Sequence, residues 1–161
     1  MERYDKLLYV GTDEELADLL ESMLAGQNCN IDRLCDSSQV IKRLQERLSW
    51  QDVTENPTLL TQRFENQYVA VLLDDDSFTS SGASLLRKIK AQYGGISVIV
   101  LTTETTLLSV CLAYLDMAEF LCFKPLEDYQ PLLDAIGRAQ RKHQCWKKVL
   151  RRLDASVPQS V

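Results

Sequence analysis

The sequence predicts an α/β fold, a doubly wound five-stranded parallel sheet with helices on both faces and an extended C-terminal helix. Five short apolar runs alternate along the chain with patterns typical of amphipathic helices. The runs are apolar almost throughout, as expected for parallel strands buried on both faces. Of the 161 residues, 45% are apolar and 25% are charged, which is ordinary for a globular domain and excludes a disordered or collagen-like chain.

Each predicted element has a local signal. The first helix follows Thr12 or Asp13 as its N-cap, and Asp36 opens the second. Residues 85–89 and 107–115 indicate two more helices, and a long last helix begins near residue 127. The polar stretch 49–67 is predicted to be an inserted loop with room for one helical turn. The expected strands are 6–10, 30–34, 68–73, 97–101 and 120–123.

Length and composition predict one domain with an extension. We expect a domain over 1–140 with its insert at 49–67, a helical extension and possible coiled coil over 141–154, and a linker or tail over 155–161. Five cysteines without a Cys-x-x-Cys pair favour a reduced, cytoplasmic protein. A single histidine leaves little material for a His-based metal site or catalytic triad. The apolar runs are too short to span a membrane, and no signal peptide is expected.

Charge is distributed unevenly. Residues 1–137 contain 22 acidic and 11 basic residues, whereas residues 138–161 contain seven basic residues and one acidic residue. Basic residues near the end of a helix suit its dipole. The acidic body would repel phosphate, and no groove-reading motif is visible, so direct binding of nucleic acid is not expected.

Polar residues follow three of the expected strands. Asp74 ends one strand, Thr102 ends the next, and Lys124 follows the last. The carboxyl ends of parallel strands meet at one edge of a sheet, which is where such folds bind ligands. A carboxylate there can attack a phosphoryl donor, while a hydroxyl and an ammonium stabilise the phosphoryl oxygens. Carboxylates and a backbone carbonyl would suit the Mg²⁺ that such chemistry normally requires.

These motifs resemble the receiver domain of bacterial two-component response regulators. The resemblance covers about residues 5–140 and rests on VLLD at 71–74, Gly82, VIVLT at 98–102 and FKP at 123–125. It implies a flavodoxin-like fold, with Asp74 as phosphoacceptor, Thr102 as switch hydroxyl and Lys124 as the phosphate-binding lysine before a cis-proline. Asp74 and the backbone carbonyl of Asp76 would be metal ligands.

The chain departs from the family pattern at two places. Gly11 and Thr12 stand where the family has an acidic pair that holds Mg²⁺, and Asp13 follows one residue late as a possible ligand. The aromatic switch position is Leu121, with Phe120 beside it. Both departures indicate an atypical receiver.

The last helix has apolar or semi-apolar residues at heptad spacing. Its outer part is predicted to form a homodimer interface as a helix pair, and the alternative is a helix that folds back on its own domain or on the insert. The predicted interface residues are His143, Trp146, Leu150 and Leu153.

Two functions stay open at this point, and neither makes the chain an enzyme in its own right. In the first, a histidine kinase or phosphotransfer protein supplies phosphate to Asp74, which controls dimerisation or an output domain. In the second, the chain is a pseudo-receiver that binds protein partners and dimerises without phosphorylation. A flavodoxin-like ligand binder or hydrolase is disfavoured because a glycine-rich phosphate loop and a nucleophile elbow are lacking.

Overall fold

The computed structural model describes residues 4–55 and 59–156, with side chains described as far as residue 153. Five parallel strands form one sheet in the order β2-β1-β3-β4-β5. This confirms the predicted fold class. The strands are β1 (Asp5–Val10), β2 (Cys29–Leu34), β3 (Ala70–Asp74), β4 (Ser97–Thr102) and β5 (Phe120–Phe123).

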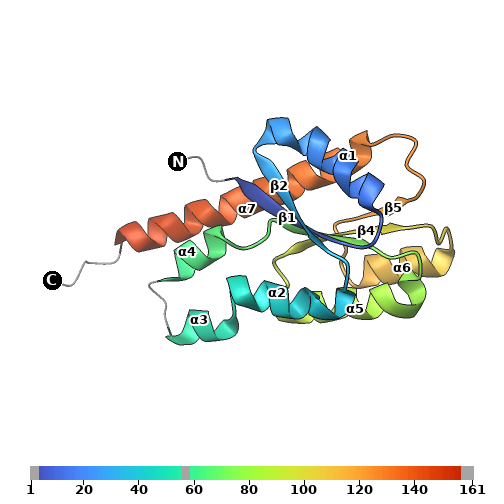
Figure 1. Ribbon diagram of the computed structural model, residues 1–161. Helices are drawn as coiled ribbons and strands as arrows, with labels where there is room; N and C mark the ends of the chain where they lie inside the picture. The colour runs from blue at the N-terminus through green and yellow to red at the C-terminus, as the bar shows by residue number, and fades with distance from the viewer. Residues whose placement is uncertain (1–3, 56–58, 157–161) are drawn as a thin grey trace.

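Helices cover both faces of the sheet (Figure 1). On one face lie α1 (Glu14–Leu24) and the first half of α7 (Gln130–Ser156), and on the other lie α2 (Val40–Arg47), α5 (Ala83–Gln92) and α6 (Leu107–Leu115). Successive side chains of β1 point to opposite faces of the sheet, so this strand contributes to a hydrophobic core on each face. Leu7 and Tyr9 face the first core, whereas Leu8 and Val10 face the second.

The first helix begins where its sequence predicts. Asp13 is the N-cap, and its Oδ1 accepts a hydrogen bond from the Leu16 amide at 3.1 Å. The buried face of α1 has the spacing of an amphipathic helix, because it consists of Leu16, Ala17, Leu20 and Leu24. Asp13 therefore stands at the sheet edge with one oxygen committed to the helix and the other available.

The insert is folded, so the prediction of a loop was wrong. It contains α3 (Trp50–Glu55) and α4 (Leu60–Glu65). Ser49 and Asp52 cap α3 reciprocally: the Ser49 amide donates to Asp52 Oδ2 at 3.0 Å, and the Asp52 amide donates to Ser49 Oγ at 3.3 Å. Helices of six residues are marginal alone, so packing on the rest of the chain supplies their stability.

The last helix packs on the sheet and then on α4, which lies beside it in Figure 1. Leu132, Ala135, Ile136 and Ala139 cover the sheet. Beyond them, His143 stacks on Phe64 with ring centroids 4.6 Å apart, and Arg151 donates to Glu65 at 2.9 Å. At His143 the structure agrees with the alternative in which the helix folds back on the insert, because the insert buries this residue. Trp146 and Leu153 are exposed and Leu150 is partly exposed.

All five cysteines are free. Cys29 and Cys122 lie in the core, where burial raises the pKa of the Cys122 thiol to about 11. Over residues 4–55 and 59–156, no helix has both the length and the apolar character needed to cross a membrane. Most of the expected C-terminal tail, residues 157–161, lies outside the described residues.

Candidate functional site

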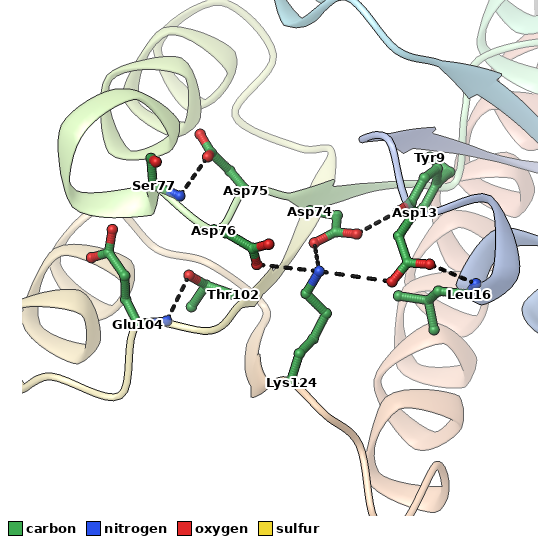
Figure 2. A network of polar contacts seen from close by, with 10 residues as sticks. All are labelled: Tyr9, Asp13, Leu16, Asp74, Asp75, Asp76, Ser77, Thr102, Glu104 and Lys124. Atoms are coloured by element: carbon green, nitrogen blue, oxygen red, sulfur yellow. Dashed lines mark hydrogen bonds and ion pairs between the residues drawn. The ribbon is translucent and has the colours of Figure 1, made fainter.

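The predicted site residues come from neighbouring strand ends. Asp74 is the last residue of β3, Thr102 is the last of β4, and Lys124 directly follows β5. Figure 2 shows these side chains together with Asp13 and Asp76 at the carboxyl edge of the sheet. The peptide bond between Lys124 and Pro125 is cis, as the resemblance implied.

The Lys124 ammonium lies among three carboxylates (Figure 2). Its Nζ is 2.7 Å from Asp74 Oδ1, 3.2 Å from Asp76 Oδ1 and 3.9 Å from Asp13 Oδ2. The Asp74 side chain is only 3% exposed, whereas Asp76 is 58% exposed. Asp74 is therefore the partner whose charge depends most on the lysine, because water can solvate Asp76.

The second oxygen of Asp74 is also occupied. The hydroxyl of Tyr9, a buried residue of β1, donates a short hydrogen bond to Asp74 Oδ2. Sequence reasoning missed Tyr9. The available signal was a phenol inside an otherwise aliphatic strand run, two residues before Gly11.

The Tyr9 hydroxyl occupies space that is open because residue 11 is a glycine and has no side chain. A Cβ at position 11 would lie 2.9 Å from the Tyr9 hydroxyl oxygen, 2.9 Å from Asp74 Cβ and 3.1 Å from the Asp74 carbonyl oxygen. These separations are shorter than carbon–carbon and carbon–oxygen contacts allow. A carboxylate side chain at position 11 and the phenol of Tyr9 therefore compete for one volume beside Asp74.

The ionisation of the network follows from burial and charge. Burial, together with the hydrogen bond to Asp74, raises the pKa of Tyr9 far above its ordinary value, so the phenol stays neutral. Burial alone would lower the pKa of Lys124. The hydrogen bonds and negative charges of Asp74 and Asp76 outweigh it and raise that pKa. The lysine is thus a permanent cation in the pocket.

Thr102 lies at the same edge but has another partner. It is fully buried, and its Oγ1 accepts a hydrogen bond from the Glu104 amide at 3.1 Å. Lys124 and Asp74 are thus in contact as expected, whereas the hydroxyl of Thr102 is engaged with its own loop (Figure 2). A role for Thr102 as a switch stays a prediction.

The position of the family's aromatic switch has a different character here. Leu121 packs against the core beneath α2, α5 and α6. Phe120 points to the opposite face, where the Arg138 guanidinium lies 5.9 Å from its ring centre. Because successive strand residues face opposite ways, Phe120 cannot substitute for an aromatic residue at position 121.

The donor set fits an ammonium better than a magnesium ion. Mg²⁺ requires oxygen ligands about 2.0–2.1 Å away in octahedral geometry. Here the Lys124 Nζ lies at the centre of the candidate ligands Asp13, Asp74 and Asp76, and Tyr9 covers the remaining Asp74 oxygen. Among the residues that the structure describes, no group of three His, Cys, Asp or Glu side chains could hold a metal ion.

Comparison with known proteins gives matches by structure only. No protein-family model matches the sequence, and no curated protein matches it. A CheY-like response regulator receiver domain from Methanospirillum hungatei superposes with a TM-score of 0.63 at 16% identity, over 88% of this chain and 98% of that one. A receiver domain from Clostridium thermocellum superposes with a TM-score of 0.65 at 21% identity, over 88% of this chain and 98% of that one.

A two-component response regulator from Clostridium difficile gives a TM-score of 0.61 at 18% identity, over 85% of this chain and 96% of that one. The chain therefore has the flavodoxin-like fold of response-regulator receiver domains. This confirms the fold that the sequence resemblance implied. The function has to be inferred from the residues of the site.

Proposed function

We propose that this chain is a signalling module of the two-component type that works as a pseudo-receiver. It binds protein partners and takes no phosphoryl group on Asp74. The receiver fold supports the signalling role by analogy of fold. The observation that carries the rest is the hydrogen bond from Tyr9 to Asp74 in the space that Gly11 leaves open.

The chemistry of phosphoryl transfer explains why this observation matters. A carboxylate that attacks phosphorus needs an oxygen free to form the new bond, and a cation must bridge it to the phosphoryl oxygens. Asp74 Oδ2 accepts the hydrogen bond from Tyr9, and Asp74 Oδ1 forms an ion pair with the Lys124 ammonium, which supplies the positive charge. The arrangement therefore stabilises the unmodified carboxylate and weakens it as a nucleophile.

The test is the intact mass after incubation with Mg²⁺ and acetyl phosphate. We expect the mass to stay unchanged, whereas a gain of about 80 Da, one phosphoryl group, that disappears in Asp74→Ala would overturn the proposal. The triple variant Tyr9→Val/Gly11→Asp/Thr12→Asp is the informative comparison. It removes the phenol and restores an acidic pair, so it should gain the modification.

A phosphorylatable receiver is the second candidate. The contact between Asp74 and Lys124 at 2.7 Å favours it, as does Thr102 at the neighbouring strand end. In that case a histidine kinase or phosphotransfer protein would be the donor, and Mg²⁺ would displace Lys124 from Asp13 and Asp76. The mass experiment distinguishes the two candidates directly.

The surface for protein contact is best placed on α6. Its sequence, LLSVCLAYL, contains no charged residue, and Leu107, Leu108, Tyr114 and Leu115 are all exposed. An apolar surface of this kind marks an interaction site. We propose that a second copy of the chain covers it. The prediction of a dimer through α7 is weaker, because the outer part of that helix contains six basic residues: Arg141, Lys142, Lys147, Lys148, Arg151 and Arg152.

Sedimentation velocity separates these surfaces. Tyr114→Glu should dissociate the dimer, whereas Trp146→Glu should leave it intact. The reverse result would restore the α7 interface, and a wild-type monomer at high concentration would remove the homodimer from the proposal.

A further inference from the structure

A second cavity lies at the opposite edge of the sheet from Asp74. It has a volume of about 380 Å³ and lies at the amino ends of β3 and β4, next to Val69 and Ser97. The insert, the loop between α5 and β4, and α7 form its walls. Its size falls within the range of small-molecule sites in proteins, roughly 300–1,000 Å³.

The wall of this cavity is apolar and rich in aromatic side chains. Trp50, Phe64, Tyr68, Tyr93 and Trp146 line it, together with Val53 and Ile96. Aromatic walls bind flat ligands well, because ring faces give large contact areas at little conformational cost. Lys142 also lines the cavity and is exposed, and no carboxylate contributes to the described wall.

Two buried polar atoms in this wall lack partners. Ser97 is 2% exposed and His143 is 7% exposed, and both line the cavity. Neither Ser97 Oγ nor His143 Nε2 has a hydrogen-bond partner among the described residues. A buried polar atom without a partner destabilises the fold, so each of these atoms calls for a partner that the protein itself does not supply.

We propose that this cavity binds a flat, uncharged, aromatic small molecule with one hydroxyl group, and that the hydroxyl hydrogen-bonds with Ser97 and His143. The stack of His143 on Phe64 fixes the imidazole against the insert. A ligand here would touch the insert, the sheet edge and α7 together, and would thus act on the outer half of α7. The site is separate from Asp74 and does not depend on the proposed pseudo-receiver function.

The test uses two fluorinated probes of nearly equal shape, 6-fluoro-2-naphthol and 2-fluoronaphthalene. Binding to the full chain is measured from ¹⁹F line broadening and from quenching of tryptophan fluorescence. Both tryptophans of the chain, Trp50 and Trp146, line the cavity, so either should report an occupant. We expect the naphthol to bind about 2- to 12-fold more tightly than the naphthalene, the equivalent of one net hydrogen bond of 0.5–1.5 kcal/mol.

Variants then place the probe. Ser97→Ala and His143→Phe should each reduce the preference for the naphthol while leaving the binding of the naphthalene. Val53→Phe fills part of the cavity and should weaken both probes at least fivefold. Leu19→Phe is the matched control, because Leu19 is exposed on α1 and does not line the cavity.

Three results would overturn the proposal. The first is no binding of the naphthol to the wild-type chain up to its solubility. The second is equal binding of the two probes to the wild-type chain. The third is binding that Ser97→Ala, His143→Phe and Val53→Phe all leave unchanged, which means adventitious surface association. If Val53→Phe fails to fold, as circular dichroism would show, the two polar variants still decide.

Discussion

Replacement of Lys124 by methionine tests the electrostatics of the Asp74 pocket. The change removes the ammonium 2.7 Å from Asp74 and keeps a side chain of similar length. Loss of one member of a buried ion pair costs about 3–5 kcal/mol, because the other charge is left without compensation. The lower end applies here, because the Lys124 side chain is 13% exposed and water screens part of its charge. We therefore expect Lys124→Met to lower the free energy of unfolding by about 3 kcal/mol at pH 7.

A double-mutant cycle assigns this loss to the right pair. In an Asp74→Asn background, loss of the lysine leaves no buried carboxylate without a partner. Lys124→Met should therefore lower the free energy of unfolding by only about 1 kcal/mol, through the loss of its contacts with the exposed residues Asp13 and Asp76. Urea unfolding of the four proteins, followed by circular dichroism, gives the coupling energy. A coupling of about 2 kcal/mol supports the account. Equal costs of Lys124→Met in the two backgrounds would refute it.

Three further changes probe other parts of the structure. Gly11→Ala should lower the free energy of unfolding by about 1–3 kcal/mol, because the new methyl group lies 2.9 Å from the Tyr9 hydroxyl oxygen and from Asp74 Cβ. Adding Tyr9→Phe should recover part of this loss. If urea unfolding shows no effect of Gly11→Ala, position 11 and Tyr9 do not compete for the same space. Burial and, to a smaller extent, the positive charge of Lys147 lower the pKa of His143 from 6.5 to about 4, against the opposing charges of Asp5 and Glu65. Because the pKa of His143 is lower in the folded protein than in the unfolded chain, protonation favours unfolding. Relative to His143→Phe, the free energy of unfolding is therefore highest above pH 6.5 and falls by about 3 kcal/mol as the pH falls through 4. A difference in unfolding free energy between the two proteins that stays constant from pH 7 to 4 would contradict this. Arg151→Ala should cost at most about 1 kcal/mol in thermal or urea unfolding, because the Arg151 side chain is 61% exposed. A loss several times larger would show that the insert depends on its pair with Glu65.

Four of the strands could be predicted because each one is a short apolar run, whereas β2 contains Asn30, Asp32 and Arg33 and gives a weaker signal. The predicted positions of Asp74 and Lys124 at one edge follow from the parallel order alone, and their contact confirms the reasoning. Thr102 lies at the expected strand end, yet its hydroxyl turns to Glu104. The strand order determines at which edge of the sheet a side chain lies, whereas its hydrogen-bond partner depends on the conformation of the loop that follows the strand.

Three features could not be predicted from the pattern. Tyr9 stands in an apolar strand pattern, and the hydrogen bond of its hydroxyl to Asp74 depends on the pairing of β1 with β3, which brings the two strand ends together. The helices α3 and α4 are too short to give a periodic signal, and they depend on packing, α4 on α7 and α3 on α4. Because α4 was not expected as a helix, packing of His143 on the insert was only the alternative to the helix-pair interface.

The central claim is that the protein's own groups occupy Asp74. Titration of the ¹⁵N-labelled chain with Mg²⁺ to millimolar concentration, followed by ¹H–¹⁵N spectra, tests it most directly. The account predicts that the amide signals of Gly11, Asp74 and Asp76 stay in place, while those of the triple variant Tyr9→Val/Gly11→Asp/Thr12→Asp shift and saturate. Saturable shifts of these signals in the wild-type chain would mean that Mg²⁺ displaces Lys124 and Tyr9, and would contradict the account.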